Sequence, residues 1–275
     1  MTSRVRCRSR SYITNRIFES KFPRYLVNMQ GPPNRRTPPI LFTRPTHEWL
    51  SRVDQRQKQL AALELTREQK ERLTQRNEIE FAYSVRTLEG MTVSREEVAD
   101  VVSSAAAKPN QSDHDARAIL EVVQSLRMIE ALIQSCGREA ELSPELLVSL
   151  NGAGSLRTTP GYSNRAIKPE HLAAAIDGAC RWYAAESFAE LHPVEQASIV
   201  LLRLIEIQPF ESANERTALL AASLFTVRRE LPPINISPEL ETTFRAALAE
   251  GFQMNTKPMV ELIAEAVERN IIWRA

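Results

Sequence analysis

A polar loop between two very apolar segments is the feature that most constrains this fold. Residues 199–205 before the loop are apolar except for Arg203, and residues 219–227 after it are again almost wholly apolar. Helices without a polar stripe are buried helices, so we expect a central buried helical hairpin with the loop at its end. Because polar loops fixed by rigid, buried elements often carry chemistry, residues 207–219 are the first candidate site.

Composition favours an all-α fold around that hairpin. The 275 residues, 43% hydrophobic and 25% charged, suffice for a real core. Glycine occurs only 8 times and aromatics make up only 6%, while helical periodicity is strong over residues 119–133. No apolar run approaches the roughly 18 residues of a membrane span, so no membrane association is expected.

Charge and cysteines narrow the partners and the compartment. A net charge of +1 gives no argument for nucleic acid as the main partner. The cysteines Cys7, Cys136 and Cys180 are odd in number and lack metal-type spacing. A reducing, cytoplasmic location is the simplest interpretation.

We expect three regions along the chain. Residues 1–46 are basic and proline-rich, and we interpret them as a disordered segment. A targeting segment, a nucleic-acid arm, or translated sequence upstream of a start near Met29 are the alternatives. Residues 47–110 should form an N-terminal helical region, and residues 111–275 should form the core domain.

The polar loop resembles the signature of the Fic family, HPFx[D/E]GNGRxxR, whose members transfer AMP from ATP to protein hydroxyls. Four positions match this signature: Pro209, Phe210, Asn214 and Arg216. Five depart from it: Gln208 at the histidine, Ser212 at the acid, Ala213 and Glu215 at the glycines, and Leu219 at the second arginine. The resemblance implies a Fic-type helical bundle with at most a short β-hairpin flap.

A second resemblance lies at Glu89-Gly90. Many Fic proteins carry [S/T]xxxE[G/N] on a helix over the ATP site, where the glutamate pairs with the second motif arginine and obstructs the γ-phosphate. Val85 stands at the Ser/Thr position here. The resemblance implies an inhibitory role for Glu89. From the residues alone, Gly90 ends one helix and Ser94 caps the next, and Glu89 is equally an ordinary helix-end residue.

Three further segments bear on the resemblance. Gly161 and Arg165 resemble the segment that leads into the family's target-binding flap, but a plain connector between helices fits them as well. Residues 244–248 resemble the family's YxxAL sequence. His192 precedes a helix-opening proline and lies too far from the motif to be its base, so we expect it to be structural.

AMP transfer needs a base, a metal held by a carboxylate, backbone N–H groups around the phosphates, and arginines. Gln208 cannot act as the base, and Ser212 is a poor magnesium ligand. Glu211 is a weak alternative metal ligand. By the resemblance, Asn214 and Arg216 keep nucleotide-binding roles, orienting the loop and contacting the leaving phosphates.

The sequence Ser212-Ala213-Asn214-Glu215 also reads as a capping box at the start of the second apolar helix. The Ser212 hydroxyl would accept from the N–H of Glu215, whose carboxylate would return to the N–H of Ser212. Such a cap would occupy the N–H groups that phosphates need, and its charge would repel phosphate. It predicts weak or absent ATP binding.

Three functions remain. The first is a catalytically impaired Fic-like protein, without a confident cofactor, that acts on a protein partner as a regulatory or interaction module. The second is a divergent nucleotidyl or phosphoryl transferase that uses ATP and Mg, with Glu211 as the metal ligand. The third is a relic with no maintained role.

Overall fold

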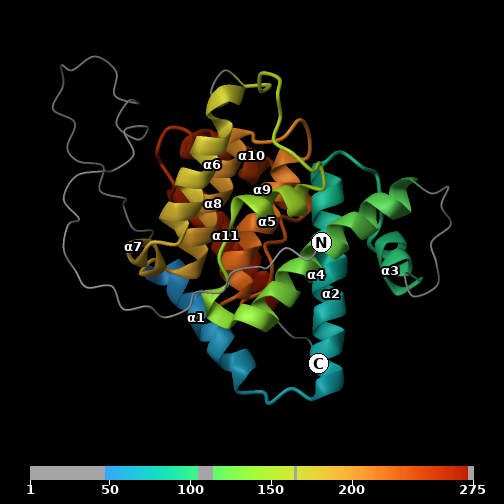
Figure 1. Ribbon diagram of the computed structural model, residues 1–275. Coiled ribbons are helices and arrows are strands. Elements are labelled where there is room, and N and C mark those ends of the chain that lie inside the picture. Colours follow the sequence, from blue (N-terminus) through green and yellow to red (C-terminus); the bar gives the residue numbers. More distant parts are fainter. Residues whose placement is uncertain (1–46, 105–113, 164–165, 272–275) are drawn as a thin grey trace.

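Figure 1 shows the computed structural model, which describes residues 47–104, 114–163 and 166–271. The described residues form helices and no strand, so the all-α prediction is confirmed and no β-hairpin flap is present among them. The α-helices are α1 His47–Ala61, α2 Arg67–Leu88, α3 Arg95–Ser104, α4 His114–Cys136, α5 Pro144–Asn151, α6 Pro169–Tyr183, α7 Glu186–Ala189, α8 Pro193–Ile207, α9 Asn214–Val227, α10 Glu241–Gly251 and α11 Lys257–Ile271. Two 3-10 turns, η1 Gly137–Glu139 and η2 Pro238–Leu240, connect them.

Helices α8 and α9 form the predicted central hairpin (Figure 1). Most side chains of both helices are buried, as expected for helices without a polar stripe. Helix α8 begins with Pro193 after the cap residue His192, whose Nδ1 accepts a hydrogen bond from the N–H of Val194 at 3.2 Å. The structural role predicted for His192 is therefore confirmed.

The other helices pack around this hairpin. Helices α4 and α5 contact α9, and α11 contacts α8. Helix α1 lies along α11, while α2 packs against α3 and α4 (Figure 1). The C-terminal end of α2 thereby comes close to the start of α9.

The predicted C-terminal end of α2 and the predicted start of α3 are confirmed. The helical stretch from residue 47 breaks at residues 62–66. Helix α2 ends before Gly90, which has a φ of +85°, a conformation that glycine adopts without steric cost. Ser94 then caps α3, because its hydroxyl accepts from the N–H of Glu97 at 3.2 Å and the Glu97 carboxylate accepts from the N–H of Ser94 at 2.7 Å.

Some expectations concern residues outside the described part. These are the disordered segment 1–46, the boundary at residue 110, and Arg165 of the expected flap. Among the described helices, none combines the length and the apolar character that crossing a membrane requires.

Candidate functional site

The motif loop joins α8 to α9 and has a left-handed residue at each end. Gln208 ends α8 with a φ of +50°, and its N–H donates to the carbonyl of Leu204 at 3.0 Å. Ala213 precedes α9 with a φ of +56°. Left-handed backbone costs a residue with a Cβ roughly 1–2 kcal/mol, so the loop keeps at Ala213 a shape for which glycine is better suited.

Asn214 closes the loop on itself. Its Oδ1 accepts from the N–H of Phe210 at 3.0 Å, and its Nδ2 donates to the carbonyl of Phe210 at 2.8 Å. Both groups are buried, so this pair of bonds fixes the five-residue turn. Asn214 therefore orients the loop, as predicted, while nucleotide binding by Asn214 stays a prediction.

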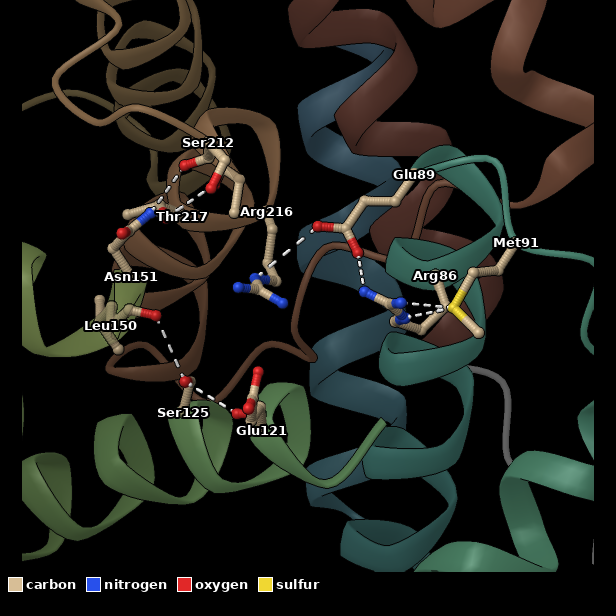
Figure 2. Close-up of polar contacts among 11 residues, drawn as sticks. Arg86, Glu89, Met91, Glu121, Ser125, Leu150, Asn151, Ser212, Arg216 and Thr217 are labelled. Atoms are coloured by element: carbon tan, nitrogen blue, oxygen red, sulfur yellow. Dashed lines mark hydrogen bonds and ion pairs between the residues drawn. The ribbon is translucent and has the colours of Figure 1, made fainter. Parts of the chain in front are cut away.

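Asn151, the last residue of α5, fixes the other side of the loop (Figure 2). Its Nδ2 donates to the carbonyl of Ser212 at 3.1 Å and to the Thr217 hydroxyl at 2.9 Å. The Thr217 hydroxyl in turn donates to the carbonyl of Ala213. These bonds attach the start of α9 to α5.

Gln208, at the position of the family's histidine, is buried beneath the segment 157–163. Its side chain is 4% exposed, and its Oε1 accepts from the N–H of Ser163 at 3.3 Å. A Cβ on Gly161 would lie 2.4 Å from the Cβ of Ala166 and 2.7 Å from that Oε1, so a larger residue here would force the segment to shift. The amide is thus shielded by the chain's own residues.

Arg157 holds the covering segment in place. Its guanidinium is buried and donates to three carbonyls, those of Gln208, Thr159 and Ile167. The backbone N–H of Arg157 also donates to the carbonyl of Pro209 at 2.9 Å. The covering segment and the motif loop therefore form one hydrogen-bonded unit.

Glu211, the weak metal-ligand candidate, is used in the same unit. One carboxylate oxygen accepts from the N–H groups of Thr158 and Thr159, at 3.0 and 3.3 Å, and the other accepts from the Thr159 hydroxyl at 2.6 Å. The Thr159 hydroxyl, and then the Thr158 N–H, hold the pKa of Glu211 below its ordinary value. Both carboxylate oxygens of Glu211 therefore accept hydrogen bonds from the protein itself.

The capping box predicted for Ser212 and Glu215 is wrong. The cap residue of α9 is Ala213, which offers no side-chain acceptor, and no side chain caps the helix. The Glu215 carboxylate instead accepts from the Arg245 guanidinium of α10. A charged donor outcompetes a neutral N–H, and Ser212 stands one residue too early for the box geometry.

Glu89 lies beside Arg216, the first motif arginine, whereas the second resemblance implied a pair with the second one (Figure 2). Its Oε1 is 3.8 Å from Nε of Arg216, and its Oε2 accepts from the Arg86 guanidinium on the same helix. Leu219, at the second arginine, is 1% exposed and belongs to the hydrophobic core. The structure thus brings Glu89 to the motif helix without the arginine that the family provides there.

Four residues of the site were missed from the sequence: Asn151, Arg157, Arg86 and Arg245. Only Arg86 had a readable signal, because opposite charges three residues apart in a helix meet on one face. Asn151 and Arg245 reach the loop across long sequence separations, and so does Arg157 in its bond to Gln208, which no local pattern shows. Within the described residues, no cluster of three or more His, Cys, Asp or Glu side chains suits a metal ion.

Comparison with known proteins supports the resemblance. Residues 126–226 match the family model described as the Fic/DOC family. The chain is 24% identical over 203 residues to protein adenylyltransferase fic-1 of Caenorhabditis elegans, covering 70% of this chain and 40% of the relative. It is 21% identical over 237 residues to protein adenylyltransferase Fic of Nematostella vectensis, covering 82% of this chain and 55% of that protein. The chain therefore spans about half of these relatives or less.

Two solved structures share the fold. A fragment of Fic-1 from C. elegans superposes with a TM-score of 0.70 at 21% identity, over 82% of this chain and 69% of that one. A Fic domain containing signaling protein from Bacteroides thetaiotaomicron gives 0.71 at 22% identity, over 81% and 95%. Residues 126–226 thus match the Fic/DOC family model, and the chain shares the fold of these solved Fic structures.

Proposed function

We propose that this chain is a Fic-type protein, related to protein adenylyltransferases, that is impaired in AMP transfer and acts as a regulatory or interaction module. The observation that carries the proposal is the state of Gln208. A carboxamide neither takes nor gives a proton near neutral pH, and this one is buried and hydrogen-bonded to Ser163. Loss of a positioned base typically costs about 10²- to 10⁴-fold in rate.

The loop is also poorly suited to hold magnesium. Ser212 stands where the family has a carboxylate, and a hydroxyl is a weak ligand for this cation. Glu211 is the nearest carboxylate in sequence, but both of its oxygens accept hydrogen bonds from residues 158–159. A metal at Glu211 would require those bonds to break, so the residues present do not fit the ion.

One observation favours the alternative, a divergent nucleotidyl or phosphoryl transferase that uses ATP and Mg. Because Glu215 faces Arg245, its carboxylate does not occupy the backbone N–H groups at the start of α9. An uncapped helix start next to Arg216 suits a phosphate group. We therefore propose that the loop binds phosphate-bearing ligands weakly and does not transfer AMP.

We further propose a protein as the partner, by analogy with relatives that are protein adenylyltransferases. The net charge of +1 offers no general attraction to nucleic acid. A cytoplasmic location stays a prediction from the cysteines.

The proposal is tested by titrating ATP with Mg by calorimetry and by incubating the full chain with labelled ATP and a protein acceptor mixture. We expect millimolar or undetectable binding and no labelling above a no-protein control. Gln208→His alone should stay inactive, because Ser212 still lacks the carboxylate. Gln253→His, at an exposed glutamine on the surface, is the matched control. Micromolar binding with robust labelling by the unaltered chain would establish the transferase alternative.

A further inference from the structure

The Glu89 carboxylate lies between two guanidinium groups but is held by only one of them. Figure 2 shows the Glu89 carboxylate between the Arg216 and Arg86 side chains, with a dashed line to each. Arg86 Nη1 donates to one oxygen of Glu89, whereas Nε of Arg216 is 3.8 Å from the other. Charged hydrogen bonds span about 2.7–2.9 Å, so the contact with Arg216 is an ion pair without a hydrogen bond.

The end of α2 fixes Arg86 in this position. The turn at Gly90 brings the chain back, and the N–H of Met91 donates to the carbonyl of Arg86 at 3.0 Å. The Met91 sulfur then lies 2.8 Å from Nε of Arg86. Upstream, the Ser84 hydroxyl donates to the carbonyl of Ile236 at 2.7 Å and anchors the helix. The Arg86 side chain is 11% exposed, so it has little freedom to turn away.

The charges of Arg86, Glu89 and Arg216 do not cancel. Two arginines face one glutamate, and Leu219, one turn after Arg216 on α9, contributes no charge. Without Arg86, Glu89 and Arg216 would neutralise each other. With Arg86, the carboxylate has a closer counterion and Arg216 keeps uncompensated positive charge at the start of α9.

We propose that Arg86 is a positioning residue that draws the Glu89 carboxylate away from Arg216 and so leaves Arg216 available to a phosphate-bearing ligand. Arg86 acts through Glu89 and does not itself contact the ligand. The inference rests on the proposed function in one respect, namely that the start of α9 accepts phosphate groups. It adds that the contact between Glu89 and Arg216 is weakened by Arg86, three residues before Glu89.

The first test does not depend on any ligand. In a crystal structure of Arg86→Ala, we expect Glu89 to close on Arg216 to about 3.2 Å or less, the range of a hydrogen bond. The Nε–Hε resonance of Arg216 should shift accordingly, and Arg86→Lys, which keeps the charge, should restore much of the original spectrum. A distance unchanged from 3.8 Å with an unmoved resonance would overturn the inference. Thermal unfolding of each variant establishes that it is folded.

The second test measures binding of inorganic tripolyphosphate to the full chain by calorimetry. Arg86→Ala should weaken binding by about fivefold or more, a typical coupling between sites. In the Glu89→Gly background, where no carboxylate remains to be positioned, the same substitution should have no effect. Equal weakening in both backgrounds would make Arg86 a direct ligand and overturn the inference.

Arg72→Ala provides the matched control, because Arg72 lies on α2, is exposed, and pairs with Glu68 in the same helix. It should change neither the Arg216 resonance nor tripolyphosphate binding. If no variant binds tripolyphosphate, including Glu89→Gly, phosphate binding by the loop is refuted. The position of Glu89 in Arg86→Ala still decides the role of Arg86.

Discussion

The Glu215 carboxylate accepts a hydrogen bond from the Arg245 guanidinium of α10, and it therefore faces away from the backbone at the start of its own helix. This contact contradicts the capping box predicted from the sequence. In that prediction, Ser212 and Glu215 cap α9 and exclude anions. In the structure, Ala213 is the cap residue and the capping role of Ser212 disappears.

Ser212→Ala should accordingly leave stability almost unchanged. The Ser212 hydroxyl caps no helix, so we expect the free energy of unfolding in urea to change by less than about 0.5 kcal/mol. Ser143→Ala is the matched control, because the Ser143 hydroxyl does cap α5 by accepting from the N–H of Leu146 at 3.1 Å. That control should lose about 1 kcal/mol. A similar loss for Ser212→Ala would reinstate the capping box.

The capping-box error shows what local patterns can and cannot establish. The S-x-x-E spacing is correct at Ser94 and Glu97, where both bonds form. The same spacing fails at Ser212, because a cation 30 residues later competes for the carboxylate. The local sequence predicted the cap at Ser94, where the Glu97 carboxylate bonds within the same turn. It could not reveal that Arg245 would bind the Glu215 carboxylate.

The fold was more predictable than the site. Buried helices follow from the lack of a polar stripe, so α8 and α9 were predicted from the sequence. The covering of Gln208 depends on Arg157, which lies 51 residues before it. Nothing near Arg157 in the sequence indicates that its guanidinium is buried against three carbonyls.

Arg157→Met should be strongly destabilising. It removes a buried charge together with its hydrogen bonds to the carbonyls of Gln208, Thr159 and Ile167, and it leaves those carbonyls without their donor. We expect a loss of about 2–4 kcal/mol in urea unfolding, since bonds to charged groups are worth roughly 1.5–3 kcal/mol each but are not additive. Arg181→Ala, at an exposed arginine paired with Asp177, is the control. A loss as small as that of the control would show that the covering segment is held by other contacts.

Asn214→Ala should loosen the motif loop. The substitution removes both bonds to Phe210, whose buried N–H and carbonyl then lack a partner. We expect a loss of about 2–3 kcal/mol, and faster hydrogen exchange at the Phe210 amide. Asn214→Asp keeps the acceptor for that amide and should protect it partly. Asn255→Ala, at an exposed asparagine, should alter neither measurement. Unchanged exchange at Phe210 in Asn214→Ala would contradict the assignment of Asn214 as the residue that closes the loop.

Glu130 on α4 should make stability fall as pH rises. Burial, and then the neighbouring Glu78 carboxylate, raise the pKa of Glu130 from 4.5 to about 7. Between these values the folded chain binds a proton that the unfolded chain has lost, so the free energy of unfolding decreases through that window. After allowance for solvent screening, the contribution is roughly 1 kcal/mol at pH 8. Glu130→Gln should therefore be more stable than the unaltered chain at pH 8 by that amount, and this gain should vanish at pH 4. Glu121→Gln, at an exposed position of the same helix, should give no such crossover. Parallel pH profiles for Glu130→Gln and the unaltered chain would show that Glu130 ionises equally in the folded and unfolded states.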